Sequence, residues 1–175
     1  LLAGIVGAGL AVVGATMQAA VRNPLADPYL LGTSSGASVG VVVVIMLGVN
    51  FFEPYSLSIL AFFGAVGSFV IVFTMAQTGG RISPTRLILA GVATAYILSA
   101  VTSFLLFVGD DRAIRVVLYW MLGTLSGAEW DYLWLPAAAL FFGITILVLK
   151  YRQLNALLAG EETATALGVD TQAFR

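Results

Sequence analysis

The stretch Arg22-Asn23-Pro24-Leu25-Ala26-Asp27-Pro28-Tyr29-Leu30-Leu31-Gly32 lies between two long apolar segments that carry no charge. Proline fixes its own φ and disfavours helix in the residue before it, so Asn23 and Asp27 are expected to be extended. The sequence therefore predicts an ordered turn here instead of a continuing helix. After the turn, glycine recurs every fourth residue from Gly32 to Gly40, a spacing typical of membrane helices in close contact.

The composition indicates an integral membrane protein. Hydrophobic residues make up 60% of the chain and charged residues 10%, whereas a soluble domain carries about 25% charged residues. The chain has no Cys, which excludes disulfides, and no His, which removes the commonest metal ligand. No basic patch points to nucleic acid, and the sequence predicts neither a cofactor, a metal site nor a catalytic constellation.

Five apolar segments reach or approach the roughly 20 residues that a helix needs to cross a bilayer of about 30 Å. They lie at residues 1–21, 33–49, 57–77, 86–108 and 132–150. The predicted fold is therefore all-α: a polytopic bundle of about five membrane helices forming a single transmembrane domain over residues 1–175. The chain begins inside an apolar run without Met, and we expect it to be part of a longer protein.

The connections and charges predict an orientation. An amphipathic piece at 112–121 is expected to be a short helix at the membrane interface, in contact with lipid. Six of the eight basic residues fall on one side of the predicted spans, which places the 22–32 turn, the 78–85 turn and the tail from 151 in the cytoplasm.

The tail at 151–175 predicts a partner. Its segment from Gly160 to Gly168 starts with Glu161 and Glu162, continues with good helix formers and ends in glycine, as a short capped helix does. Such a helix suits a groove on another protein. The plainer interpretation is that the carboxylates only stabilise the helix start.

The five predicted spans contain no ionisable residue except near their ends. Ion-coupled transporters normally keep such a residue, or a broken helix, at mid-membrane. Energy for any transport is therefore expected from outside this segment. A secondary transporter or channel is the first alternative, and a membrane scaffold without transport is the second.

Polar residues near the turn allow two interpretations each. Gln18 either lines a solute pathway or makes an interhelical hydrogen bond, and the bond is favoured. Asn23 and Asp27 either cap the turn or shape the inner mouth of a pathway. The stripe of Gly32, Gly36 and Gly40 is interpreted as helix packing, with a dimer contact as the alternative, and Gly91 is a further packing candidate.

Several motifs of this chain resemble those of the FecCD family, and they follow one another in the same order as in that family. Its members are the permeases of ABC importers for iron-siderophores, haem and vitamin B12. The most specific is the run from Asn23 to Gly32, "NPLADP…LG". The other matching stretches are Gly14–Gln18, Leu31–Ala37, Arg86–Val92, Tyr119–Gly123 and Leu157–Gly168.

The resemblance implies a permease subunit with ten membrane helices in two inverted halves, of which this chain holds the second to sixth. It implies a homodimer or a pair of homologous permease subunits, two ATP-binding cassette ATPase subunits below, and a periplasmic or lipid-anchored solute-binding protein above. ATP hydrolysis would lie in the ATPases, so the chain itself is not expected to be an enzyme. The expected location is the cytoplasmic (inner) membrane of a bacterium, with iron(III)-siderophore as the first cargo and haem or vitamin B12 as alternatives.

The resemblance also implies residue roles. The ATPase-coupling helix would comprise Gly160, Glu161, Glu162, Ala164, Leu167 and Gly168. The cytoplasmic gate or pathway would include Gln18, Asn23, Pro24, Leu25, Pro84 and Thr85. Other members can carry a hydroxyl residue where this chain has Pro84, which argues against a hydrogen-bonded gate at that position.

Overall fold

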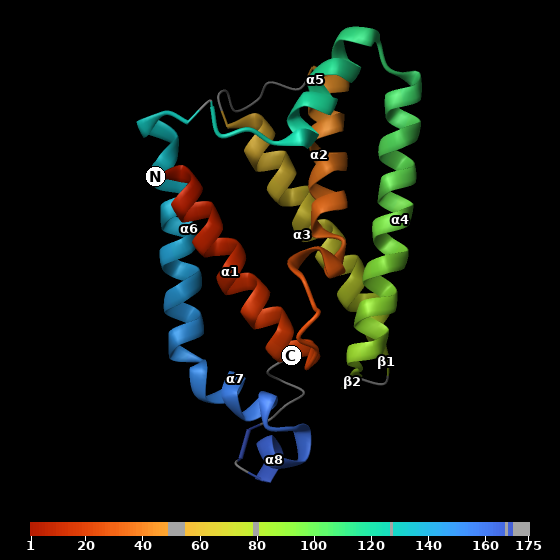
Figure 1. The fold of residues 1–175 in the computed structure, drawn as a ribbon. Helices are drawn as coiled ribbons and strands as arrows, with labels where there is room; N and C mark the ends of the chain where they lie inside the picture. Colours follow the sequence, from red (N-terminus) through yellow and green to blue (C-terminus); the bar gives the residue numbers. More distant parts are fainter. Residues whose placement is uncertain (49–54, 79–80, 127, 167, 170–175) are drawn as a thin grey trace. The chain divides into compact units, whose positions relative to one another are not determined.

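The computed structural model describes residues 1–48, 55–78, 81–126, 128–166 and 168–169. The elements, drawn in Figure 1, are α1 (Leu2–Val21), the 3₁₀ helix η1 (Pro28–Leu31), α2 (Thr33–Leu47), α3 (Ser56–Ala76), β1 (Gln77–Thr78), β2 (Arg81–Ile82), α4 (Pro84–Val108), α5 (Asp111–Leu122), α6 (Trp130–Leu149), α7 (Tyr151–Leu158) and α8 (Glu161–Ala166). Among these residues the only strands are the antiparallel pair β1–β2, two residues each. The predicted all-α fold is confirmed.

Each predicted span corresponds to a helix, but the second is shorter than expected. α1, α3, α4 and α6 are long and apolar enough to cross a membrane. α2 has 15 residues, which at 1.5 Å per residue is about 22 Å, less than the hydrocarbon thickness. Its last turn is capped by Gly48 in the left-handed conformation, φ 62°, which stops the helix before the predicted end at residue 49. Residue 49 itself lies outside the described residues.

The chain forms two compact units, and each is described by itself. One comprises Leu1–Pro28 and Thr124–Arg175, and the other comprises Tyr29–Gly123. The first unit therefore contains α1, α6, α7 and α8. The second contains α2 to α5 with the two short strands.

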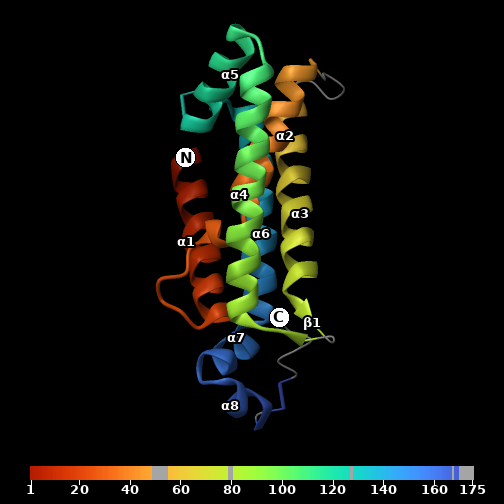
Figure 2. The same ribbon diagram turned by 90° about the vertical axis from the view of Figure 1, so that its right-hand side faces the viewer.

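The second unit is built on a close contact between α2 and α3, which lie side by side in Figure 2. A Cβ atom at Gly36 would overlap the Gly64 carbonyl oxygen, and a Cβ atom at Gly64 would overlap the Gly36 carbonyl oxygen. One turn further along α2, a Cβ atom at Gly40 would overlap the Leu60 carbonyl oxygen. The two backbones can approach this closely only because these positions lack side chains.

A buried hydrogen bond fixes the start of α2. The Ser68 hydroxyl donates to the Gly32 carbonyl oxygen at 2.9 Å. Gly32 has φ 65°, a conformation that a side chain would strain, and Ser68 is 2% exposed. α2 and α3 also bury the valine side chains of the unit's core: Val41, Val42, Val44 and Val72.

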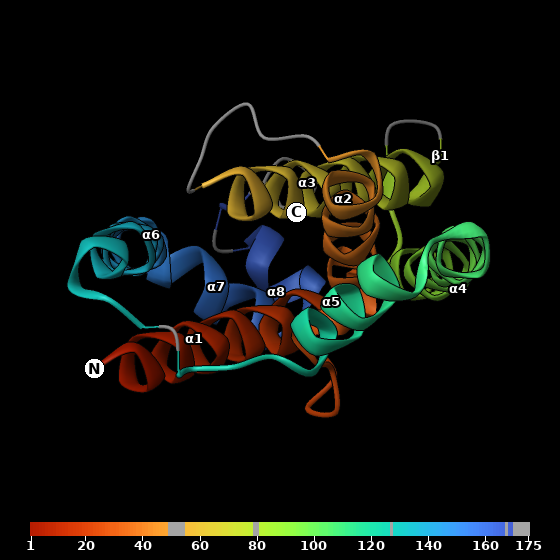
Figure 3. The same ribbon diagram turned by 90° about the horizontal axis from the view of Figure 1, so that it is seen from above.

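α4 and α5 complete the second unit (Figure 3). α4 passes so near η1 that a Cβ atom at Gly91 would overlap the Leu30 carbonyl oxygen. α5 begins at Asp110, whose carboxylate accepts hydrogen bonds from the backbone N–H of Arg112 and Ala113 at 2.9 and 2.8 Å. Its buried residues, Ala113 and Val117, are one turn apart, as the amphipathic pattern predicts.

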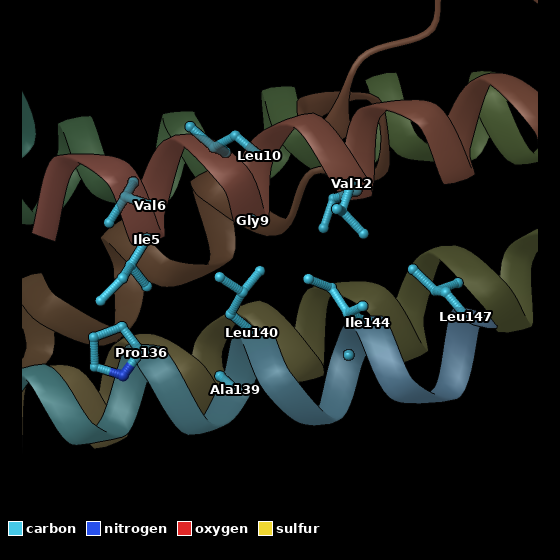
Figure 4. A pocket seen from close by; sticks show the side chains of 12 residues that line it. Ile5, Val6, Gly9, Leu10, Val12, Pro136, Ala139, Leu140, Ile144 and Leu147 are labelled. Atoms are coloured by element: carbon cyan, nitrogen blue, oxygen red, sulfur yellow. The ribbon is translucent and has the colours of Figure 1, made fainter. Parts of the chain in front are cut away.

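In the first unit, α1 packs against α6 and α7. Figure 4 shows an open groove between α1 and α6, lined by apolar residues such as Ile5, Leu10, Leu140 and Leu147. α7 leaves the end of α6 at an angle and leads into α8 (Figure 1). The sequence interpretation missed α7 as a separate helix.

The α2–α3 contact gives the first testable prediction. Gly64→Ala places a methyl group against the Gly36 backbone and should cost about 1–3 kcal/mol, the usual penalty for overpacking. Gly67→Ala, in the same helix, adds the same methyl group where nothing lies within 4 Å. The thermal midpoint of the detergent-purified protein should fall for Gly64→Ala and be unchanged or rise for Gly67→Ala. Equal midpoints for the two variants would contradict the contact.

Candidate functional site

The polar turn starts where α1 stops. Arg22 has φ 53° and ψ 41°, and among the described residues it is the only non-glycine residue with positive φ. The Gln18 carbonyl oxygen accepts the backbone N–H groups of Arg22 and of Asn23, the latter at 3.2 Å. This left-handed cap ends the helix and satisfies its last carbonyls. The Gln18 side chain is exposed within the structure.

Asn23 then organises the turn. Its side-chain oxygen accepts the Leu25 N–H at 2.9 Å, and its carbonyl accepts the Ala26 N–H at 3.0 Å. This Asx turn buries Ala26, 3% exposed, and leaves Leu25 86% exposed. Pro24 is exposed beside it. The turn is thus ordered, as predicted. Hydrogen bonds within the turn hold its backbone, and the apolar side chain of Leu25 is left exposed.

The second candidate gate segment opens α4. Pro84 occupies the first turn of the helix, where its missing N–H costs nothing, and Thr85 is exposed. Ser83, directly before the helix, makes no side-chain capping hydrogen bond. Pro84 has no backbone N–H, so the start of the helix has one donor fewer that needs a capping partner. Asn23 belongs to the first unit and Pro84 to the second.

The tail folds as two short helices in contact with each other, α7 and α8, and the segment predicted for coupling contains α8. α7 buries Ala156 and Leu157, and α8 buries Ala164, which is 0% exposed. The N–H groups of Gly168 and Val169 bond to the carbonyls of Thr165 and Ala164 at 2.9 and 3.0 Å.

Gly160 and Gly168 both have positive φ, 115° and 79°. Glu161 and Glu162 form the first turn of α8, and Leu167 lies outside the described residues. Thr163, Thr165 and Ala166 are exposed. Ala164 is buried, so it is not available to a binding partner. A surface of α8 that binds a partner would consist of the exposed residues beside Ala164.

The four glycines predicted for packing all lie in the second unit, where Gly36, Gly40 and Gly91 face backbone atoms of a neighbouring element. The sequence interpretation missed their partners on α3 and η1, which are Leu30, Leu60, Gly64 and Ser68. The spacing of Gly64 and Ser68, four residues apart, is the small-residue pattern that could have indicated this face of α3.

Over the ranges that the structure describes, no group of three or more His, Cys, Asp or Glu could hold a metal ion. The polar features of the described residues are instead turns, helix caps and hydroxyl groups.

The sequence model of the FecCD transport family matches residues 1–175, so the chain belongs to this family. The resemblance read from the "NPLADP…LG" motif is therefore confirmed. Family membership indicates a multi-pass membrane protein.

Three relatives illustrate the match. The chain is 41% identical to the cobalamin import system permease protein of Halobacterium salinarum, over 97% of this chain and 45% of that protein. It is 38% identical to the vitamin B12 import system permease protein of Klebsiella pneumoniae, over 98% of this chain and 51% of that protein. It is 40% identical to the hemin transport system permease protein of Yersinia pestis, over 98% of this chain and 52% of that protein. The chain thus spans about half the length of these relatives.

The fold is also similar to a solved inward-facing structure assigned to the metal-chelate type of ABC transporter. The TM-score is 0.87 at 29% sequence identity, over 99% of this chain and 55% of that one. The relatives come from an archaeon and from bacteria, so the predicted bacterial source does not follow from the family.

The Asx turn gives the second prediction. Asn23→Ala removes the acceptor for the Leu25 N–H and should lower stability by about 0.5–1.5 kcal/mol, the usual net value of one hydrogen bond. Asn23→Asp keeps an acceptor oxygen at the same place and should lose much less. Thermal midpoints and protease cleavage at the turn measure both. A loss for Asn23→Asp as large as that for Asn23→Ala would show that the side-chain acceptor does not hold the turn.

Proposed function

We propose that the chain is part of the membrane-spanning subunit of an ATP-driven ABC importer that moves a bulky metal chelate inward across the cytoplasmic membrane. In this proposal it supplies the second to sixth helices of a ten-helix subunit. The observation that carries the proposal is membership of the FecCD family together with spans that hold no ionisable group away from their ends. A path of this kind has no built-in means of coupling to an ion gradient.

The proposed cargo is an iron(III)-siderophore, with cobalamin and haem as alternatives of the same class. The relatives named for cobalamin and hemin support the class and favour no member of it. A neutral passage lined by small and hydroxyl residues suits a large chelate that needs few specific contacts. Selectivity would then lie in a separate solute-binding protein.

Energy would enter through α7 and α8. These helices follow α6, and their internal caps and buried alanine and leucine side chains make a rigid projection instead of a loose tail. We propose that the exposed side of α8 lies in a groove of an ATP-binding cassette ATPase, with Glu161, Glu162 and Leu167 beside it and Gly160 and Gly168 shaping its ends. A second permease subunit, identical or homologous, would complete the pathway.

The gate assignment remains part of the proposal. Gln18, Asn23, Pro24, Leu25, Pro84 and Thr85 would belong to the cytoplasmic gate or pathway. The strongest candidate among them is Leu25, because an apolar side chain held out by an ordered turn can exclude water from a narrow opening.

Partner binding is the test. Ala166→Arg adds a bulky charge to the exposed side of α8 and should prevent co-purification of the ATPase with the intact permease, with loss of ATP-driven uptake of ferric siderophore, cobalamin or haemin. Ala128→Arg makes the same change at another exposed position and should leave ATPase binding intact. Normal ATPase binding by the Ala166→Arg variant would overturn the coupling role of α8. Uptake of none of the three chelates would overturn the cargo class.

A further inference from the structure

α6 is apolar over the length of a bilayer. From Leu133 to Leu149 its only polar side chain is that of Thr145, whose hydroxyl donates to the Phe141 carbonyl oxygen at 2.7 Å. Contacts between membrane helices are enriched in small residues, so large exposed side chains and a hydroxyl satisfied within its own helix suit lipid tails. The large side chains in the second half of α6 that are 60–74% exposed are Phe141, Phe142, Ile146, Val148 and Leu149.

Aromatic residues mark both ends of this helix. Trp130 is its first residue and Tyr151 comes directly after its end cap, and they are 77% and 51% exposed. The 20 residues of α6 span about 30 Å at 1.5 Å per residue, which equals the thickness of the hydrocarbon core. Tryptophan and tyrosine concentrate at the two membrane–water interfaces. Tyr151 and its neighbours are therefore expected at the level of the lipid headgroups.

The chain changes direction at this level. Lys150 ends α6 and directly precedes α7, which leaves α6 at an angle (Figure 1). α7 is anchored by its buried residues Ala156 and Leu157, whereas Lys150, Tyr151 and Arg152 are exposed. These three exposed residues form the corner cluster.

The cations of the corner cluster suit a phosphate. The Arg152 Nε donates to the Tyr151 hydroxyl at 3.1 Å, and the guanidinium carbon lies 5.8 Å from the centroid of the Tyr151 ring. The terminal amino groups of Arg152 are not used in that bond, and in arginine they can bind two phosphate oxygens at once. Lys150 adds a second cation. No acidic residue occurs from Tyr132 to Gly160, so the cluster is a local excess of positive charge along the chain.

We propose that the corner cluster binds an anionic phospholipid. The Lys150 ammonium and the Arg152 guanidinium bind the headgroup phosphate, and an acyl chain lies against exposed side chains at the end of α6, such as that of Leu149. The site prefers a lipid with net negative charge, because the choline group of phosphatidylcholine would bring another positive charge beside the two cations. The inference does not depend on which solute the protein moves.

Lipid binding tests the proposal. The intact permease, purified in detergent, would be titrated with phosphatidylglycerol or phosphatidylcholine, and bound lipid would be counted by native mass spectrometry. A basic residue near an anionic membrane surface contributes about fivefold in affinity, so Lys150→Gln with Arg152→Gln should weaken binding of the first phosphatidylglycerol at least about tenfold. Lys150→Arg with Arg152→Lys keeps both charges and should bind this lipid nearly as the native protein does.

The matched control is Arg112→Gln with Arg115→Gln, which removes two positive charges from exposed positions of α5. It should leave the affinity for phosphatidylglycerol nearly unchanged. An equal loss in the two glutamine double variants, or no loss in either, would overturn the proposal. Loss of ATPase co-purification by Lys150→Gln with Arg152→Gln, at unchanged lipid affinity, would overturn it too and assign the corner cluster to the ATPase.

The acyl-chain contact has its own measurement, since this chain has no native cysteine. With any other cysteines of the intact permease replaced, a spin label would be attached to the Thr145→Cys variant in phosphatidylglycerol bilayers. The label should collide readily with oxygen, which concentrates in lipid, and rarely with a water-soluble nickel complex. Asn155→Cys, at an exposed position of α7, should show the reverse. Rare collisions of the label at position 145 with both reagents would mean that another helix covers this side of α6 and would refute the lipid contact.

Discussion

The structure depends on backbone-to-backbone contact between helices that have little else to hold them together. In hydrocarbon, apolar side chains gain nothing by leaving lipid for one another, so close packing and a few hydrogen bonds must supply the stability. Gly36 and Gly64 provide that contact by leaving each carbonyl in the space where the other residue would carry a side chain. The Ser68–Gly32 hydrogen bond and the passage of Gly91 over Leu30 follow from the same close approach. Together they fix which side of α4 is covered and which side is left open.

Close packing of this kind needs few charges, and charged residues make up only 10% of the chain. The second unit is held by glycine contacts and by buried hydroxyl groups such as that of Ser68. In the proposed function, the energy of ATP hydrolysis would reach the chain through α7 and α8, which belong to the other unit. In the proposed function, path and energy input are thus separate parts of the molecule, which agrees with spans that lack an ionisable group away from their ends.

The sequence predicted the helices well because apolar length and proline placement are local signals. The stop after α1, the start of α4 at Pro84 and the amphipathic α5 all follow from residues within one turn of the boundary. The family followed from the "NPLADP…LG" motif. The sequence did not reveal that α2 ends at Gly48, that α7 is a separate helix, or that Leu60 and Gly64 face the glycine stripe. These features depend on a left-handed cap and on contacts between helices distant in sequence. The sequence also did not reveal that Ala164, one of the predicted coupling residues of α8, is buried.

The source of energy tests the central claim most directly. The intact permease with its ATPase, reconstituted in proteoliposomes, would be supplied with a ferric siderophore, cobalamin or haemin through its binding protein. Uptake would be followed with and without ATP, and with and without a proton or sodium gradient. The account predicts uptake that requires ATP and continues after an ionophore removes every gradient. Uptake that persists without ATP and stops when the proton gradient is dissipated would contradict it.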